Sequence, residues 1–269
     1  MMSQWPDPAT EDAWAAYWND EATVWDSAPG GSVSGELERV AWLDALTEQL
    51  PPAPADVVDV GTGTGEMALL LANLGHRVTG VDFAEHMLRR ARDKARSVSS
   101  SPSFADGDGA DPPIRFVHGD AADPPIPSGS MDAVINRWVL WALPDPERAL
   151  SAWRRLLRPA GRLVVFDSWW WGREWIEDPG YRPMLTSGSE VSGDHSMPDD
   201  LQLPIKDVRA VVEIEELATT AGFVDVAVER LPRVEMAWRN AHTGSIMDGL
   251  PIHVLSARTP TPSGSTPRR

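Results

Sequence analysis

The chain has 269 residues, of which 42% are hydrophobic and 24% are charged, as in an ordinary globular protein with one large core. It contains no cysteine, which excludes disulfides, thiolate nucleophiles, zinc–thiolate sites and iron–sulfur clusters. The formal net charge of −16 opposes binding to nucleic acid, and no apolar run approaches the roughly 20 residues that cross a bilayer. Because the N-terminus does not resemble a secretory signal, we expect a cytoplasmic protein that binds neither nucleic acid nor membranes.

The first 54 residues are predicted to form a helical segment. Apolar side chains recur at three- and four-residue spacing between positions 11 and 50, with a break at Ser27–Gly31. Pro51, Pro52 and Pro54 then end the second helix. A compact core is expected to begin at residue 55 and to extend to 257, followed by a disordered tail over 258–269.

Strands and helices alternate through the core, which predicts an α/β fold with a doubly wound, mostly parallel sheet. Short apolar runs end in turn residues, whereas the segments between them have helical periodicity and helix-ending signals. The predicted strands are 56–60, 77–82, 114–120, 131–138, 161–167, 224–231 and 251–257, and the predicted helices are 66–75, 84–96, 146–159 and 212–223.

Two stretches interrupt this alternation. Residues 97–113 are rich in Ser, Gly, Asp and Pro, and we expect a flexible loop there rather than a metal site, because the acidic pattern lacks the terminal Glu of a calcium loop. Residues 169–210 leave from the carboxyl end of the fifth strand, where open α/β sheets bind ligands. We interpret 169–210 as a substrate lid.

The segment VVDVGTGTG, residues 57–65, is the strongest motif in the chain. Three alternating glycines let backbone amides approach a ligand, and the following helix start contributes a positive partial charge. Such a turn also serves nicotinamide or flavin cofactors, or is purely structural. Asp82, at the end of the second strand, favours a binding site because a carboxylate there can accept both hydroxyls of a ribose.

The order and spacing of the motifs resemble the class I S-adenosylmethionine-dependent methyltransferases, in particular the small-molecule group that includes the ubiquinone and menaquinone biosynthetic enzymes. Three segments carry the resemblance and cover most of residues 55–168. They are VVDVGTGTGEMALLLANLGHRVTGVDFAEHMLRRAR, FVHGDAADPPIPSGSMDAVINRWVLWAL and ALSAWRRLLRPAGRLVVFD. The resemblance implies a seven-stranded Rossmann-like sheet, a helical N-terminal cap over 1–54, and S-adenosyl-L-methionine as the cofactor.

The resemblance also implies roles for individual residues. The turn from Asp59 to Gly65 holds the methionine end and the ribose side, Asp82 binds the ribose hydroxyls, and Phe83 packs against the adenine. Asp120 accepts the exocyclic amine of the adenine, although capping of a turn is its alternative role. The implied cofactor residues are Trp25, Asp59, Gly61, Thr62, Gly63, Gly65, Asp82, Phe83, Met87, Asp120, Ala121, Asn136 and Arg137.

Tryptophan is unusually frequent, with 13 Trp against 2 Tyr and 5 Phe. Many of the Trp residues fall where the resemblance places the acceptor, which favours an aromatic pocket for a flat or hydrophobic molecule. For any single Trp, ordinary core packing is an equal alternative. The predicted substrate residues are Trp138, Trp141 and Trp169, together with Arg137 as a partner for an anionic group.

Methyl transfer from a sulfonium needs an oriented, unprotonated nucleophile, and a general base only where the acceptor is a hydroxyl or a protonated amine. His195 lies beside Asp194 in the predicted lid and is the candidate base, with a simply exposed histidine as the alternative. No metal is expected.

The sequence therefore predicts a methyltransferase acting on O or N of a small aromatic or hydrophobic metabolite, of the kind found in secondary metabolism. One alternative is methylation of a peptide or protein terminus, which needs an open groove. Another is a cofactor-binding member of the fold that transfers no methyl group. The expected assembly is a monomer or a homodimer.

Overall fold

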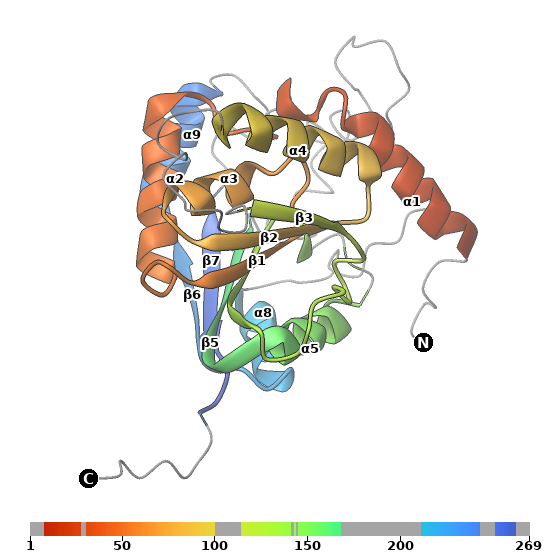
Figure 1. Ribbon diagram of the computed structural model, residues 1–269. Helices are drawn as coiled ribbons and strands as arrows, with labels where there is room; N and C mark the ends of the chain where they lie inside the picture. The colour runs from red at the N-terminus through yellow and green to blue at the C-terminus, as the bar shows by residue number, and fades with distance from the viewer. Residues whose placement is uncertain are drawn as a thin grey trace, which may run out of the picture.

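The computed structural model describes residues 8–27, 31–99, 114–140, 143, 145–167, 211–242 and 251–261. Seven strands form one sheet in the order β3-β2-β1-β4-β5-β7-β6, with β7 antiparallel to both of its neighbours and the other pairs parallel (Figure 1). The prediction of a mostly parallel, seven-stranded sheet is confirmed. The strands are β1 Asp56–Val60, β2 Arg77–Asp82, β3 Ile114–His118, β4 Met131–Arg137, β5 Leu157–Asp167, β6 Val224–Arg230 and β7 His253–Arg258.

Helices cover both faces of the sheet (Figure 1). Helices α2, α3, α4 and α9 lie on one face, α5 and α8 lie on the other, and α1 packs along α4. The helices are α1 Pro8–Glu21, the 3-10 helix η1 Trp25–Ser27, α2 Gly35–Gln49, α3 Glu66–Asn73, α4 Glu85–Ser99, α5 Pro146–Leu156, α8 Val211–Thr220 and α9 Pro232–Ala241.

The central strands feed two hydrophobic cores because successive side chains of a strand point to opposite faces. Val57 of β1 packs in the core beneath α2, α3 and α9, whereas Val58 packs beneath α5 and α8. Trp42, Trp153 and Trp238 are all buried in these cores. For these three Trp residues, core packing is what the structure shows.

Some boundaries differ from the prediction. The helix expected over 146–159 ends at Leu156, because the chain enters β5 at Leu157 and pairs there with Met131 of β4. Helix α4 extends to Ser99, three residues into the predicted loop. Helix α9 was not predicted, although its buried side chains at 234, 237 and 238 have helical spacing.

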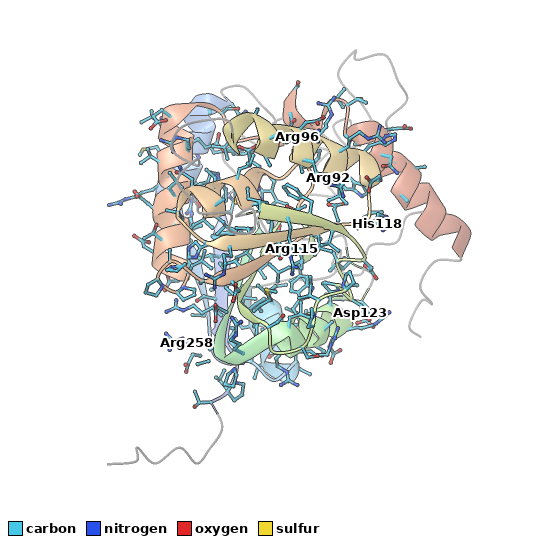
Figure 2. All side chains as sticks on the ribbon, in the orientation of Figure 1. Arg92, Arg96, Arg115, His118, Asp123 and Arg258 are labelled. Atoms are coloured by element: carbon cyan, nitrogen blue, oxygen red, sulfur yellow. The ribbon has the colours of Figure 1, made fainter. Side chains whose placement is uncertain are left out.

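Arginine side chains of α4 and α5 carry their charges on the outer surfaces of these helices. Arg92 and Arg96 lie on the outer side of α4 (Figure 2), where Arg92 pairs with Glu85 at 2.7 Å. Arg155 of α5 pairs with Asp123 at 2.6 Å. None of the described helices is both long and apolar enough to span a membrane.

Candidate active site

A cavity of about 450 Å³ opens at the carboxyl ends of β1, β2 and β4. Most residues that the sequence assigns to a cofactor line it, although they come from separate parts of the chain. The cofactor residues in its wall are Trp25, Asp59, Gly61, Thr62, Gly63, Asp82, Phe83, Met87, Asp120, Ala121 and Arg137, and the predicted substrate residue Trp138 lines it too. The sequence did not single out Thr64, Glu66, Met67, Leu143 or Arg148, which also line it.

The glycine turn joins β1 to α3 and is fixed by backbone hydrogen bonds. The amides of Gly61 and Thr62 both donate to the carbonyl of Val81, at 2.8 and 2.9 Å. Gly61, Gly63 and Gly65 have φ angles of +69°, +54° and +83°, which L side chains rarely adopt. The turn ends at Gly65, the N-cap of α3, where no side chain caps the helix. The amide of Ala68 donates to the Asp59 carboxylate, and the earlier amides of the first turn of α3 are left for a ligand.

At two of these positions, neighbouring side chains leave no room for a Cβ atom. A Cβ on Gly61 would stand 2.3 Å from a methyl group of Val139, inside any normal contact distance. A Cβ on Gly65 would stand 2.9 Å from the Cβ of Ala91. Gly65 packs against α4 and does not line the cavity, so glycine at this position serves packing between the helices.

Asp82 is the last residue of β2, and its carboxylate bonds both the glycine turn and the segment that follows β2. Its Oδ2 accepts the amide of Gly63 at 2.8 Å, and its Oδ1 accepts the amide of Ala84 at 2.9 Å. Burial raises the pKa of this carboxyl, and the backbone amides oppose the rise. Each carboxylate oxygen keeps a second lone pair, so Asp82 can still accept hydrogen bonds in the cavity.

Asp59 lies at the opposite end of the turn, where it accepts a hydrogen bond from Thr62 Oγ1 at 2.6 Å. Burial raises the pKa of Asp59 to about 7, against the opposing effects of that hydrogen bond and of the positive charge on Arg137. An acid poised near neutrality in a cavity is typical of a binding site, because a cationic ligand would draw it into its charged form.

The end of β4 places two polar residues very differently. Asn136 is fully buried, donates to the carbonyl of Val60 at 3.0 Å, accepts the amide of Leu140 at 3.2 Å, and does not line the cavity. Arg137 does line it, with its guanidinium 5.5 Å from the ring centre of Trp42 and 4.7 Å from that of Trp138. The Asn136 side chain holds the strand ends together, and Arg137 forms the wall.

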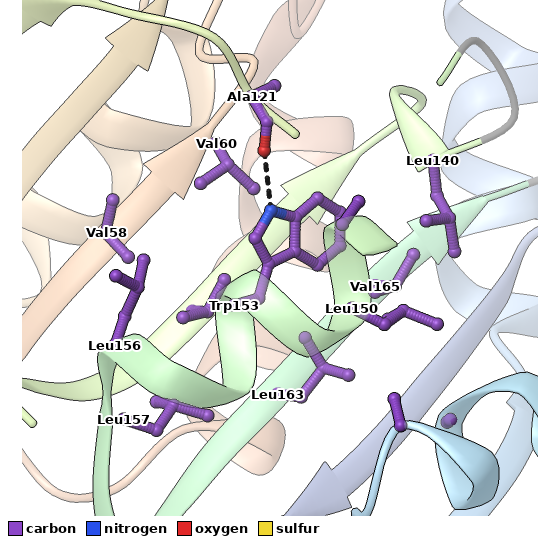
Figure 3. Close-up of a cluster of buried hydrophobic side chains, with 14 of the residues drawn as sticks. Val58, Val60, Ala121, Leu140, Leu150, Trp153, Leu156, Leu157, Leu163 and Val165 are labelled. Atoms are coloured by element: carbon purple, nitrogen blue, oxygen red, sulfur yellow. Dashed lines mark hydrogen bonds between the residues drawn. The ribbon is translucent and has the colours of Figure 1, made fainter. Parts of the chain in front are cut away.

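Asp120 and Ala121 follow β3 and form one wall of the cavity. Asp120 Oδ1 accepts the amide of Ala122 at 2.8 Å, which is the turn-capping role, while Asp120 also lines the cavity. The carbonyl of Ala121 accepts the indole N–H of the buried Trp153 at 2.7 Å (Figure 3). Through this hydrogen bond, helix α5 holds Ala121 in place in the cavity wall.

The N-terminal segment covers the cavity from the side of α4. Trp18 and Trp25 make an edge-to-face pair with ring centres 5.3 Å apart, and the indole nitrogen of Trp25 is 4.0 Å from where a Cβ on Gly63 would lie. Next to Trp25, Asp26 accepts hydrogen bonds from Thr64 Oγ1 and from Lys94 Nζ, both at 2.6 Å.

Sequence reasoning missed Asp26 and Lys94 because these contacts join positions 38 and 68 residues apart. Trp141, Trp169 and His195 lie outside the described residues, as does the whole predicted lid. Among the residues that the structure describes, no group of three or more His, Asp or Glu is arranged to hold a metal ion.

The cavity has the features that an adenosylated amino acid requires. The bare glycine turn, the uncapped start of α3 and the Asp82 carboxylate offer partners for ribose and polar groups. The Trp25 indole and Met87 give an apolar and aromatic cover. The residues present therefore fit S-adenosylmethionine.

Comparison with known proteins gives the same result. The family model described as a methyltransferase domain matches residues 58–165. Demethylmenaquinone methyltransferase of Thermus thermophilus is 38% identical over 125 residues, which are 46% of this chain and 51% of that protein. Ubiquinone biosynthesis O-methyltransferase of Xanthomonas axonopodis pv. citri is 34% identical over 144 residues, 54% and 56% of the two chains. The chain thus spans about half the length of these curated relatives.

Solved structures share the fold. Phosphoethanolamine N-methyltransferase 2 of Haemonchus contortus, in complex with S-adenosyl-L-methionine, matches with a TM-score of 0.61 at 17% identity, over 90% of this chain and 57% of that one. The [4+2]-cyclase SpnF matches with a TM-score of 0.60 at 19% identity, over 92% and 95%. Residues 58–165 therefore resemble a methyltransferase domain, and the fold is that of solved S-adenosylmethionine-dependent methyltransferases.

Proposed function

We propose that this protein transfers a methyl group from S-adenosylmethionine to an oxygen or nitrogen atom of a small aromatic or hydrophobic acceptor. The observation that carries the proposal is the Asp82 carboxylate, hydrogen-bonded to the amide of Gly63 at the floor of a cavity that ends beside Trp138. This arrangement supports a bound nucleoside with its reactive end directed toward the carboxyl end of β4.

The cofactor supplies a methyl group on a positively charged sulfur, which is open to in-line attack. The protein's contribution is to orient both reactants and to exclude water. In this proposal Asp82 and Asp120 hold the ribose hydroxyls and the adenine amine, and Phe83 and Met87 enclose the ring; all four line the cavity. The aromatic rings of Trp25 and Trp138 offer faces that attract a cationic methyl group.

Water exclusion is assigned to the cap and the lid. In this proposal, residues 1–54 close the cofactor side through Trp18 and Trp25, and residues 169–210 close the acceptor side. Trp138, Trp141 and Trp169 then form the aromatic acceptor pocket. Of the described residues that line the cavity, none is a histidine, so the proposed general base remains His195 in the lid.

The direct test is turnover with a set of acceptors. Because two relatives are named for menaquinone and ubiquinone biosynthesis, the first set comprises phenols, catechols and quinols, each incubated with S-adenosylmethionine. Formation of S-adenosylhomocysteine together with a product heavier by one methylene unit supports the proposal. Asp82→Ala is the control that removes product while the folded structure persists.

Two alternatives have their own outcomes in this experiment. Methylation of added peptides, but of none of the small molecules, favours the peptide-terminus alternative. Binding of the cofactor with no S-adenosylhomocysteine from any acceptor favours a member of the fold that does not methylate. The fold likeness to a [4+2]-cyclase is the reason for keeping this second candidate.

A further inference from the structure

The wall of the cavity carries more acidic than basic side chains. Among its described residues there are five carboxylic acids and two arginines, and no lysine or histidine. When Asp59, whose pKa is about 7, is protonated, four carboxylates still face two guanidinium groups. The potential in the cavity is therefore negative. The acids are Asp59, Glu66, Asp82, Asp120 and Asp145, and the arginines are Arg137 and Arg148.

Arg137 is the half-buried arginine of this described wall, and carboxylates offset its charge. Its guanidinium lies against two Trp rings, 5.5 and 4.7 Å from their centres. Burial lowers the pKa of the guanidinium, whereas the negative charges of three carboxylates raise it. These carboxylates belong to Glu66, Glu38 and Asp59. An anion at this end of the cavity would be repelled by all three while the guanidinium attracted it.

Two further cations lie close to the wall, and each has an acid beside it. Lys94 Nζ is 3.3 Å from Glu66 but 2.6 Å from Asp26, so one positive charge is shared by two carboxylates. Arg148 lies in the first turn of α5, next to the N-cap residue Asp145, and both side chains are exposed. Water weakens the attraction of an exposed guanidinium for an anion. Neither cation reverses the sign of the potential.

The proposed reaction moves positive charge from the cofactor to the acceptor. The lone pair of an uncharged acceptor atom forms a bond to the methyl carbon, and the electron pair of the broken C–S bond stays on sulfur. The positive charge then lies on the acceptor atom, and a methylated nitrogen keeps it until a proton passes to water. Carboxylates around the site stabilise this developing charge. They raise the energy of an acceptor that is already anionic.

We infer that the cavity selects its acceptor by charge, taking an uncharged or cationic aromatic molecule such as an aromatic amine and rejecting an anionic one. The inference rests on the proposed function, because it assumes an acceptor that enters this cavity. It differs from the sequence-based expectation that Arg137 binds an anionic group of the acceptor. The net charge of −16 acts in the same direction, since the field of the whole chain repels anions.

The test compares three aromatic amines of similar size that differ in the charge of one side chain. Para-aminophenylpropanamide is uncharged there, para-aminophenylpropanoate carries a carboxylate, and para-aminophenylethylamine carries an ammonium group. Each is titrated by calorimetry into protein saturated with S-adenosylhomocysteine. The carboxylate is expected to bind at least about tenfold more weakly than the amide of the same shape. The ammonium compound is expected to bind at least as tightly as the amide.

A substitution in the wall tests whether the cavity is the source of this selection. Glu66→Gln removes one wall carboxylate and is expected to narrow the difference between amide and carboxylate by about threefold, with the affinity for the amide changed less than twofold. Asp44→Asn is the matched control, because Asp44 is an exposed acid of α2 that does not line the cavity. It is expected to leave the difference unchanged.

Two results would overturn the inference. One is binding of the carboxylate as tightly as the amide, or more tightly. The other is equal narrowing by Asp44→Asn and Glu66→Gln, which would assign the selection to the overall charge of the protein. The titrations require no turnover. If the three amines bind in the expected order but none is methylated by S-adenosylmethionine, the proposed function is contradicted and the charge selection stands.

Discussion

Asp26 accepts a hydrogen bond from Thr64 Oγ1 at 2.6 Å, and this contact ties the N-terminal segment to the glycine turn. Lys94 of α4 donates to the same Asp26 oxygen and also lies 3.3 Å from Glu66. Because Trp25 precedes Asp26 in η1, the position of its ring over Gly63 depends on this cluster.

Asp26→Ala is expected to weaken cofactor binding without unfolding the core. It removes two hydrogen bonds, one of them to a charged partner, worth about 1.5–3 kcal/mol where burial is partial, and it frees η1 to move. We expect the Kd for S-adenosylhomocysteine, measured by calorimetry, to rise about tenfold, which corresponds to about 1.4 kcal/mol. Asp93→Ala removes an exposed acid of α4 paired with Arg96, and serves as control. Equal affinities for the two variants would contradict the role of Asp26.

Asp59 predicts a dependence of stability on pH. Its pKa rises from an ordinary 3.8 to about 7 in the folded protein, so between these values the unfolded chain binds fewer protons than the folded one. Stability therefore falls as pH rises through this window. Asp59→Asn removes the titration, and the unliganded variant is expected to gain thermal stability over the unsubstituted protein at pH 7.5 but not at pH 4. If the two proteins differed in thermal stability by the same amount at both pH values, titration of Asp59 would not be the cause of the pH dependence.

The same carboxyl predicts how ligand affinity varies with pH. An ammonium group favours the charged form of Asp59, so binding of S-adenosylhomocysteine is expected to strengthen from pH 5.5 to 7, by at most about tenfold for each pH unit. Asp59→Asn is expected to bind more weakly at pH 7 and with a flatter pH dependence. Calorimetry at four pH values measures both slopes, and parallel slopes would argue against Asp59 as the responsive group.

The sequence predicts the cofactor side of the site well because its residues lie directly at the ends of strands, which short sequence motifs reveal. Asp82 ends a strand, and the glycines follow one, so their common edge follows from the parallel sheet. Asn136 and Gly65 were assigned to the cofactor by motif position; in the structure the Asn136 side chain bonds the backbone of Val60 and Leu140, Gly65 packs against α4, and neither residue lines the cavity. A motif predicts where a residue lies along the chain. It does not predict whether its side chain points into the cavity or against a neighbouring helix or strand.

Contacts between residues far apart in the sequence cannot be predicted from local sequence patterns. Asp26 and Lys94 look like ordinary charged residues of solvated helices, and only the folded chain brings them to the glycine turn. Helix α9 begins at Pro232, its N-cap residue Leu231 makes no capping hydrogen bond, and the helix was missed despite its buried Trp238. Tertiary packing against α2 supplies the stability that local propensity does not.

Trp153→Phe tests how α5 fixes the wall of the cavity. The substitution leaves the carbonyl of Ala121 without its indole donor, and we expect a loss of about 1–3 kcal/mol in the free energy of unfolding. Because Ala121 lines the cavity, binding of 5′-methylthioadenosine is also expected to weaken. Trp238→Phe is the matched control, since its buried indole nitrogen makes no hydrogen bond among the described residues. Equal loss of stability in both variants would assign the effect to packing volume.

Gly61→Ala separates backbone strain from steric contact. Gly61 and Gly129 have similar φ angles, +69° and +63°, but a Cβ on Gly61 meets Val139 whereas a Cβ on Gly129 meets nothing within 4 Å. Both substitutions are expected to cost about 1–2 kcal/mol through the left-handed backbone, and Gly61→Ala about 1–3 kcal/mol more through overpacking. Urea unfolding measures the difference. Adding Val139→Ala is expected to recover the second part only, because it makes room for the methyl group and leaves the backbone angle unchanged. Failure of that double variant to recover stability would show that the contact with Val139 is not what requires glycine at this position.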